Sequence, residues 1–239
     1  MLRRLSVFAF AAVLAGCATT STSPFGGSGG NQPKHMIKIV TANSDLRAQV
    51  EQAMATSGTL SPVSEDEFSA YNLVINDGLP AERAESLGSK PRIVGVLKAE
   101  KRPAYYRMGY TLLDMQGKPV TSGDVVGVGD NQQAMFPALR DAGSASPAAL
   151  GDAVSQLVTE LGKRLASQAW RSTVLSQEGT QVVIAGSRAQ GLKEGMTFEV
   201  ENLPGSSLKV VGFKDNDETV LDVVAGATPS VGYIVTRTR

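Results

Sequence analysis

Polar and hydrophobic positions divide this chain of 239 residues into four stretches. Residues 1–16 hold an uncharged apolar run, and residues 17–35 are rich in Gly, Ser and Thr. In residues 36–170, runs with a period of two, which predict strands, alternate with runs with a period near 3.6, which predict helices. Residues 171–239 hold only short strand-like runs separated by turn residues. The pattern predicts a leader, a flexible tether, an α/β domain and a small β domain.

The beginning of the α/β domain predicts a strand followed by an amphipathic helix. The strand covers residues 36–41, Asn43 can cap the helix that follows, and Gly58 can end it. The apolar positions on one face of this helix are Leu46, Val50, Ala53 and Met54. Residues 64–68 predict a second, short helix, and residues 71–76 predict another strand.

The middle of the chain predicts an antiparallel meander. Residues 92–100 are apolar on both parities, which is typical of a central strand, and residues 106–112 alternate as a half-buried strand does. A Gly-containing turn at residues 114–118 leads to a hairpin partner at residues 120–128. We expect residues 129–146 to be mostly loop, because Gly, Ser, Asn and Asp are frequent there.

A long helix is predicted over residues 148–169, where Ser146 and Pro147 supply an entry signal. Its apolar stripe consists of Leu150, Val154, Leu157, Val158, Leu161 and Leu165. The stripe indicates a helix that covers the sheet, although it could instead receive a partner.

The last 69 or so residues predict a small barrel or sandwich. Its strand-like runs are residues 182–184, 197–200, 208–211, 220–223 and 233–235. The fold class is therefore α+β: an α/β sandwich, in which two helices cover a mixed sheet with an antiparallel meander, followed by a small all-β, barrel-like domain.

The N-terminus has the plan of a secretory signal peptide. Arg3 and Arg4 precede the apolar residues 5–15, a run shorter than the roughly 20 residues that span a bilayer. The run ends in four residues that resemble a bacterial lipobox, namely Leu14, Ala15, Gly16 and Cys17. The resemblance implies that Cys17 receives a diacylglycerol, that the chain is cut before it, and that its new amino group is acylated. The alternative is an ordinary cleaved signal with an incidental cysteine.

A lipid at Cys17 would determine the location of the mature protein. Several acyl chains, at about 0.8 kcal/mol for each buried CH₂, make such an anchor effectively permanent. Ala18 follows the cysteine, and by resemblance to sorted lipoproteins the lack of Asp there favours the outer membrane. We expect the domains to face the periplasm.

The inventory of reactive side chains excludes several classes of function. Basic and acidic residues number 23 each, and the loss of Arg3 and Arg4 makes the mature chain slightly acidic, so nucleic acid is not an expected partner. Cys17 is the only cysteine, and His35, the only histidine, is expected to be a solvated residue of the tether. We therefore expect no enzyme, no metal site, no cofactor beyond the covalent lipid, and no small-molecule substrate.

Two short motifs match known sites by letter only, and a third stretch offers oxygen ligands without the full calcium-loop pattern. Residues 26–30 fit Gly-x-Ser-x-Gly and residues 206–209 fit Ser-x-x-Lys, but neither lies in the strand and helix context that a hydrolase requires. Residues 215–218 are acidic but lack the Gly and distal Glu of a calcium loop, so a solvated hairpin is favoured.

A protein-recognition surface is the remaining candidate. Tyr106 and Tyr110 share the apolar parity of their strand and are expected in the core. Tyr105 and Arg107 lie on the other face, and tyrosine is favoured at interfaces. These two residues are our candidate interaction surface.

The chain also resembles a family. Leu112 or Leu113, Asp114, Gly117 and Ser122 match a hairpin pattern, Leu-x-Asp-x-x-Gly-x-x-x-x-Ser, of envelope lipoproteins related to the curli secretion protein CsgG, the synthase activator LpoB and the amino-terminal domain of TolB. Residues 181–184 and 191–200 are similar to the carboxy-terminal β domain of the flagellar assembly protein FlgT.

The resemblance implies a non-enzymatic outer-membrane lipoprotein that assembles or stabilises an envelope machine, such as a flagellar, secretion or surface-polymer export apparatus. Its partners would be envelope proteins, and a homo-oligomeric ring is one form the assembly could take. The alternative is a periplasmic activator of a cell-wall synthase. A carbohydrate-binding or enzymatic domain is a third, less favoured interpretation.

Overall fold

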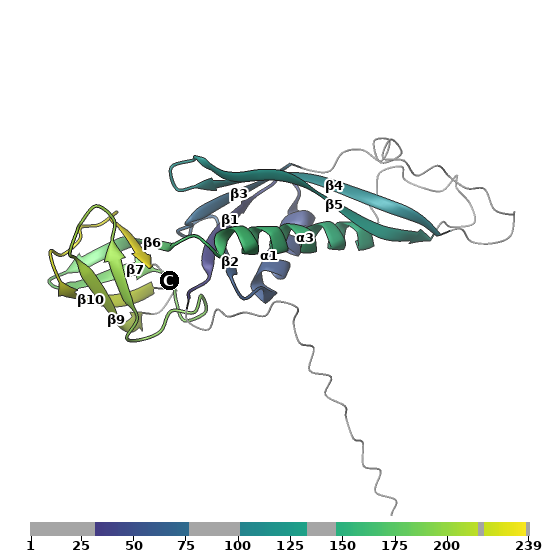
Figure 1. Cartoon of the computed structure of the whole chain (residues 1–239). Helices are drawn as coiled ribbons and strands as arrows, with labels where there is room; N and C mark the ends of the chain where they lie inside the picture. The colour runs from purple at the N-terminus through teal and green to yellow at the C-terminus, as the bar shows by residue number, and fades with distance from the viewer. Residues whose placement is uncertain (1–31, 77–100, 133–146, 215–217, 238–239) are drawn as a thin grey trace, which may run out of the picture.

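In the part of the chain that the structure describes, the fold combines a five-stranded mixed sheet, two helices and a closed six-stranded barrel, as the α+β class predicted from the sequence requires (Figure 1). This computed structural model describes residues 32–76, 101–132, 147–214 and 218–237. The helices belong to the sheet, and the barrel consists of strands alone.

The sheet has the strand order β2-β1-β3-β4-β5. Its strands are β1 (His35–Val40), β2 (Leu60–Val63), β3 (Tyr71–Asn76), β4 (Lys101–Asp114) and β5 (Pro119–Gln132). β1 pairs in parallel with β2 and β3, whereas β3, β4 and β5 are antiparallel neighbours. The first part of β4 and the last part of β5 continue as a two-stranded ribbon beyond the end of β3 (Figure 1).

Both helices pack on one face of this sheet. Helix α1 (Ser44–Thr56) begins where the side-chain oxygen of Asn43 accepts hydrogen bonds from the backbone N–H groups of Asp45 and Leu46, which confirms the predicted cap. Helix α3 (Pro147–Leu165) lies under β4 and β5 (Figure 1). The core between helices and sheet is formed by the apolar faces of α1 and α3 and by alternate residues of the strands, so the predicted stripe covers its own sheet.

Helix α3 approaches β5 closely enough that their backbones touch. A Cβ atom added at Gly127 would lie 1.9 Å from the carbonyl oxygen of Ala149, and one at Gly129 would lie 2.4 Å from its nitrogen. Only glycine fits at these strand positions, because any larger residue would overlap the helix backbone.

The β4–β5 hairpin forms as the sequence predicts. The carboxylate of Asp114 accepts hydrogen bonds from the backbone N–H groups of Gln116 and Lys118, and Gly117 has a φ of 76°. This left-handed conformation is one that glycine adopts without steric cost. The turn therefore fixes the register of the long hairpin.

The barrel closes in the order β10-β7-β6-β11-β8-β9, with β9 and β10 also paired. Its strands are β6 (Trp170–Glu178), β7 (Gln181–Ala185), β8 (Thr197–Val200), β9 (Ser207–Lys214), β10 (Glu218–Ala225) and β11 (Ile234–Arg237). Each of the five strand-like runs predicted from the sequence lies almost entirely within one of the strands β7 to β11. A separate apolar core that includes Trp170, Phe198 and Leu208 fills the barrel.

Sheet and barrel share a buried junction at the beginning of β1. Met36 belongs to the barrel's core although it lies in the sheet, and it is only 2% exposed. The backbone N–H of Lys34 donates to the carbonyl oxygen of Gln190 at 2.6 Å, and the indole N–H of Trp170 donates to the carbonyl oxygen of Lys34 at 3.0 Å. The chain thus enters its first strand between the two parts of the molecule.

The expectation that His35 is a solvated tether residue is wrong. His35 is the first residue of β1, is 3% exposed, and meets the ring of Tyr71 edge to face at 5.8 Å between centroids. The Gly- and Ser-rich composition before it suggested an open position, but pairing of His35 with Leu60 of β2 draws it into the sheet.

Other local predictions also differ from the structure. Residues 64–68 form a turn rather than a helix, and the side chain of Glu67 accepts a hydrogen bond from the backbone N–H of Ser64 in this turn. β5 extends to Gln132, into the segment expected to be loop. β2 and β6 were not predicted as strands, and the strand predicted at residues 92–100 lies outside the described residues.

Candidate functional site

The open face of the sheet is a candidate docking surface in the described part of the chain. It is the face opposite to α1 and α3, and its positions alternate with those of the core. Val40 and Val128 are 44% and 49% exposed there, and Val74 and Val126 are partly exposed. Exposed valines on one sheet face are costly in water unless they are scattered or receive a partner.

Arg107, a predicted interaction residue, lies on this open face. Its guanidinium forms an ion pair with the carboxylate of Asp124 on β5, and both side chains are less than half exposed. Tyr105 belongs to β4, where it pairs with Val128, but its side chain lies outside the described residues. Tyr110, by contrast, is 2% exposed, and Tyr106 packs partly buried against the core, as the sequence predicts.

The outer edge of β5 is occupied by polar side chains of α3. The backbone N–H of Val128 donates to the carboxylate of Asp152 at 2.8 Å, and the side-chain amide of Gln156 donates to the carbonyl oxygen of Val126 at 3.1 Å. Further along, the guanidinium of Arg164 donates to the carbonyl oxygen of Val120 at 3.3 Å. These contacts satisfy edge groups that would otherwise be free to pair with a strand from another molecule.

The other outer strand and the barrel are also poor templates for strand addition. β2 has four residues and contains Pro62, which has no backbone N–H to donate. The barrel strands form a closed ring, so each has two neighbours. Docking on the described surface is therefore better suited to side chains of the open face than to these backbone edges.

Two tyrosines of the sandwich core have raised pKa values. Burial raises the pKa of Tyr71, Arg171 opposes this shift, and the carboxylates of Asp114 and Glu201 add to it. Burial also raises the pKa of Tyr110, and the carboxylate of Glu160 raises it further. Both phenols belong to the sandwich core, so their shifted pKa values follow from packing.

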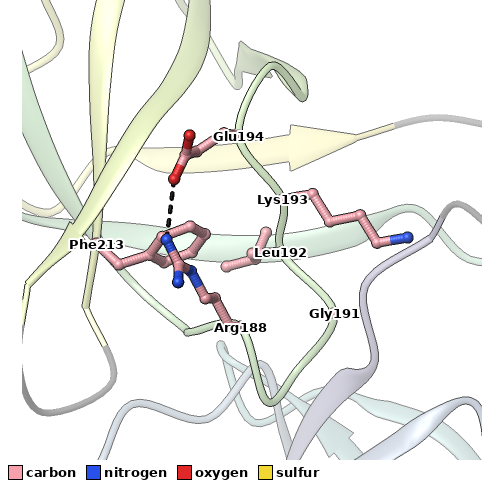
Figure 2. A pocket seen from close by; sticks show the side chains of 6 residues that line it. All are labelled: Arg188, Gly191, Leu192, Lys193, Glu194 and Phe213. Atoms are coloured by element: carbon pink, nitrogen blue, oxygen red, sulfur yellow. Dashed lines mark hydrogen bonds and ion pairs between the residues drawn. The ribbon is translucent and has the colours of Figure 1, made fainter.

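A first hollow on the barrel is filled by its own interactions. It is lined by Arg188, Gly191, Leu192, Lys193, Glu194 and Phe213 (Figure 2). The guanidinium of Arg188 lies 4.5 Å from the centre of the Phe213 ring and donates to Glu194 at 2.9 Å. Because Arg188 and Glu194 pair with each other in an exposed setting, these two charges offer little to a ligand.

A second hollow lies at the barrel rim, where β11 ends and β9 begins. Its volume is about 210 Å³, and its lining consists of Thr197, Phe198, Glu199, Ser207, Thr236 and Arg237. Strand register sets Thr236 beside Glu199 and Glu199 beside Ser207, so three neighbouring strands supply the polar wall.

The motif matches and the metal inventory give no further site. The hydroxyl of Ser206, in the Ser-x-x-Lys match, donates to the carbonyl oxygen of Ala227 at 2.7 Å, which is a structural role. Among the described residues, no group of three or more His, Cys, Asp or Glu side chains could hold a metal ion. The lipobox residues Leu14, Ala15, Gly16 and Cys17 lie outside the described part, as do residues 215–217 of the stretch weighed as a calcium loop.

No helix within the described ranges has the length and apolar character needed to cross a membrane.

Comparison with known proteins yields structures but no family. Neither a protein-family model nor a curated protein matches the chain. A structure described as a lipoprotein, from Caulobacter crescentus CB15, is 20% identical over 55% of this chain and 92% of its own, with a TM-score of 0.36. Lipoprotein B of Nitrosomonas europaea is 16% identical over 59% and 90%, with a TM-score of 0.36. A minor lipoprotein of Acinetobacter baumannii is 12% identical over 56% and 92%, with a TM-score of 0.33.

These three structures are each described as a lipoprotein. Their identities and TM-scores are too low to carry an argument about the activity of this chain. The functional interpretation therefore rests on the residues themselves.

The sequence did not reveal the polar hollow at the barrel rim. Glu199, Ser207 and Arg237 lie on three different strands, and only the register of β8, β9 and β11 brings them together. The run at residues 197–200 identified one strand, but nothing in the sequence indicated which strands would be its neighbours.

Proposed function

We propose that this chain is a non-enzymatic lipoprotein, anchored in the outer membrane through Cys17, whose sandwich and barrel form a docking unit in an envelope machine. The observation that carries the proposal is the run Leu14, Ala15, Gly16 and Cys17 at the end of an apolar leader. The partners would be envelope proteins of a flagellar, secretion or surface-polymer export apparatus.

The open face of the sheet supports a docking role. Val40 and Val128 are apolar residues exposed on this face, and the ion pair of Arg107 and Asp124 lies between their positions along the strands. Protein interfaces combine apolar and polar groups. Meanwhile, the contacts from Asp152 and Gln156 to β5 disfavour docking by strand addition.

The anchor is tested by labelling cells with a palmitate analogue and separating their membranes. Wild-type protein should carry the label and sediment with the outer membrane, whereas Cys17→Ala should carry none and lose its membrane association. Leu14→Ile, which keeps an apolar residue at the first lipobox position, serves as a matched control that should still be labelled. An unlabelled wild-type protein would overturn the anchor.

The docking role is tested separately with a photo-crosslinking residue placed at Val128 in the full-length protein. The same residue at Val231, which is 63% exposed on the barrel, is the control. We expect position 128 to capture a structural or secretion component of the envelope that position 231 does not. Capture of a cell-wall synthase would instead support the activator alternative, and equal products from both positions would contradict docking on this face.

A further inference from the structure

We propose that one end of the barrel rests on the surface of the membrane that holds the lipid anchor. The contact consists of the side chains of Leu175, Val224, Val231 and Tyr233, which are exposed at this end. The inference rests on the proposed anchor at Cys17, and it adds a second point of membrane contact within the folded part of the chain.

The topology of the barrel determines which loops share this end. Neighbouring strands are antiparallel, so the β6–β7, β8–β9 and β10–β11 connections lie at one end and the β7–β8 connection lies at the other. Trp170, at the start of β6, and Gln190, between β7 and β8, both hold Lys34 at the junction with the sheet. The β10–β11 connection, residues 226–233, is therefore at the end away from this junction.

Exposed apolar side chains gather around the β10–β11 connection. Among the described residues seven large hydrophobic side chains are exposed, and four of them lie in this connection or in the strand parts beside it. Val231 is 63% exposed, the highest value of the seven, and Val224 is 54% exposed. Leu175 adjoins the connection, because the backbone N–H of Gly232 donates to the carbonyl oxygen of its neighbour Val174. Apolar groups that cluster on a surface, rather than scatter singly, indicate a partner.

The same surface is almost free of charge, which selects the class of partner. Residues 223–236 contain no Asp, Glu, Lys or Arg. Glu178, at the end of β6, is exposed at the border of the surface, and Glu201 is paired with Arg171. An uncharged apolar surface with a tyrosine suits the interface of a lipid bilayer, where the ring lies beside acyl chains and the hydroxyl among headgroups.

The connection holds its exposed side chains in place. The backbone N–H of Tyr233 donates to the carbonyl oxygen of Ser230 at 3.2 Å. Gly232 has a φ of 87°, which fits the third position of a type II turn and sets Val231 at the tip. Pro229, directly before this turn, is buried. Because backbone groups of the turn bond within the protein, bringing the tip next to lipid leaves few of them unsatisfied.

The anchor lies within reach of this end of the barrel. Gln32, the first described residue, follows Cys17 by fifteen positions. A flexible chain of this length has an r.m.s. span of about 20–23 Å and an extended limit of about 50 Å. β6, whose nine residues run from the junction toward the exposed end, spans at most about 30 Å. An acylated Cys17 and the exposed end can therefore lie in the same membrane plane.

The anchor also makes a contact of this size effective. A few apolar side chains bind a membrane only weakly on their own, since affinity scales with the apolar area that is buried. A short tether keeps the barrel at a high effective concentration beside the membrane, so that a weak contact is populated. We therefore expect contact in the anchored chain, with little dependence on salt because no charge takes part.

The contact is tested on vesicles of phosphatidylethanolamine and phosphatidylcholine with brominated acyl chains, because bromine quenches a tryptophan that touches lipid. The chain from Cys17 to Arg239, attached through its only thiol to a maleimide-bearing lipid, is anchored independently of acylation in cells. Tyr233→Trp reports on the exposed end and Val40→Trp on the open face of the sheet, while the buried Trp170 gives a constant background. We expect quenching at position 233 that persists at high salt, and none at position 40.

The outcomes separate this inference from the proposed anchor. If position 233 is not quenched in the attached protein, or if positions 233 and 40 are quenched equally, the membrane contact is wrong and the anchor proposal stands. If wild-type protein in cells takes up no palmitate label, the anchor at Cys17 is wrong, and the contact that rests on it falls with it.

A matched pair of variants assigns the contact to the apolar side chains. In the attached Tyr233→Trp protein, Val231→Asp should remove most of the quenching, because a carboxylate resists transfer out of water. Val211→Asp, at a 41% exposed position of β9, should leave the quenching unchanged. Both positions are exposed, so neither variant is expected to unfold the barrel. Equal quenching in the Val231→Asp and Val211→Asp proteins would contradict the assignment.

Discussion

The indole N–H of Trp170 donates a hydrogen bond to the carbonyl oxygen of Lys34, at 3.0 Å and across 136 positions of the sequence. Trp170 begins the barrel, and Lys34 directly precedes the first strand of the sheet. Met36, two residues further on, is buried in the barrel's own core. Sheet and barrel therefore share apolar contacts as well as hydrogen bonds at this junction.

From this junction we predict that the two parts unfold together. Trp170 is the only tryptophan, so its fluorescence reports on the barrel, whereas the helical signal in far-UV circular dichroism reports on α1 and α3 of the sandwich. In urea both signals should change with the same midpoint. Met36→Ala should lower that midpoint, at a cost of about 2–5 kcal/mol, while Val231→Ala at an exposed position should not. Two separate transitions in the wild-type protein would show that the junction does not couple them.

Because β5 and α3 are in backbone contact, we predict that adding one methyl group at Gly127 lowers the free energy of unfolding strongly. Gly127→Ala would place a methyl group 1.9 Å from the carbonyl oxygen of Ala149, so strand and helix must separate, and we expect a loss of about 3 kcal/mol in the free energy of unfolding. Gly151→Ala, in the exposed part of α3 with no atom near the added carbon, should instead stabilise the protein by about 0.5–1 kcal/mol. Chemical denaturation of both variants measures the difference, and similar effects would refute the close approach.

Because Asp152 occupies the outer edge of β5, we predict that its removal increases self-association of the protein. Asp152→Ala frees the backbone N–H of Val128, which should raise concentration-dependent self-association and reduce stability by about 1 kcal/mol. Asp152→Asn retains an acceptor oxygen and is the matched control. Light scattering over a concentration series measures the effect, and a monomeric Asp152→Ala protein at all concentrations would argue that the edge is protected by other means.

Burial of Tyr110 predicts a loss of stability at alkaline pH. Its pKa is raised in the folded protein, so the unfolded chain loses the phenol proton first as the pH rises. The corresponding stability is fully present below about pH 10, the ordinary tyrosine pKa, and declines above it with a slope of about 1.4 kcal/mol per pH unit. The free energy of unfolding of the Tyr110→Phe variant should depend less steeply on pH in this range. Urea denaturation at several alkaline pH values measures this dependence. An unchanged pH dependence would mean that Tyr110 ionises equally in both states.

The sequence predicted those elements whose signals are local. Asn43 caps α1 through its own side chain, and the turn after Asp114 is fixed by residues within five positions, so both could be read from a short window. β2 could not, because its four residues include Pro62 and become a strand only by pairing with β1. His35 was misjudged for the same reason: its environment comes from Tyr71 and Leu60, both distant in sequence.

Candidate sites were harder to predict than elements. The parity of Arg107 correctly placed it on the face opposite to Tyr106 and Tyr110, but its ion pair with Asp124 depends on hairpin register. Arg237 and Glu199 are ordinary charged residues in sequence, and their common hollow exists only because the barrel closes.

The position of β1 has a mechanical consequence for an anchored protein. β1 lies between β2 and β3, and the chain enters it at Lys34, which is held by Gln190 and Trp170. If Cys17 is fixed in a membrane, tension on the tether pulls along the axis of β1, and the hydrogen bonds to both neighbouring strands share the load in shear. An edge strand pulled from its end would instead peel away one bond at a time. With such an anchor the fold would receive force at an interior strand, where resistance to forced unfolding is set by many bonds that must break together.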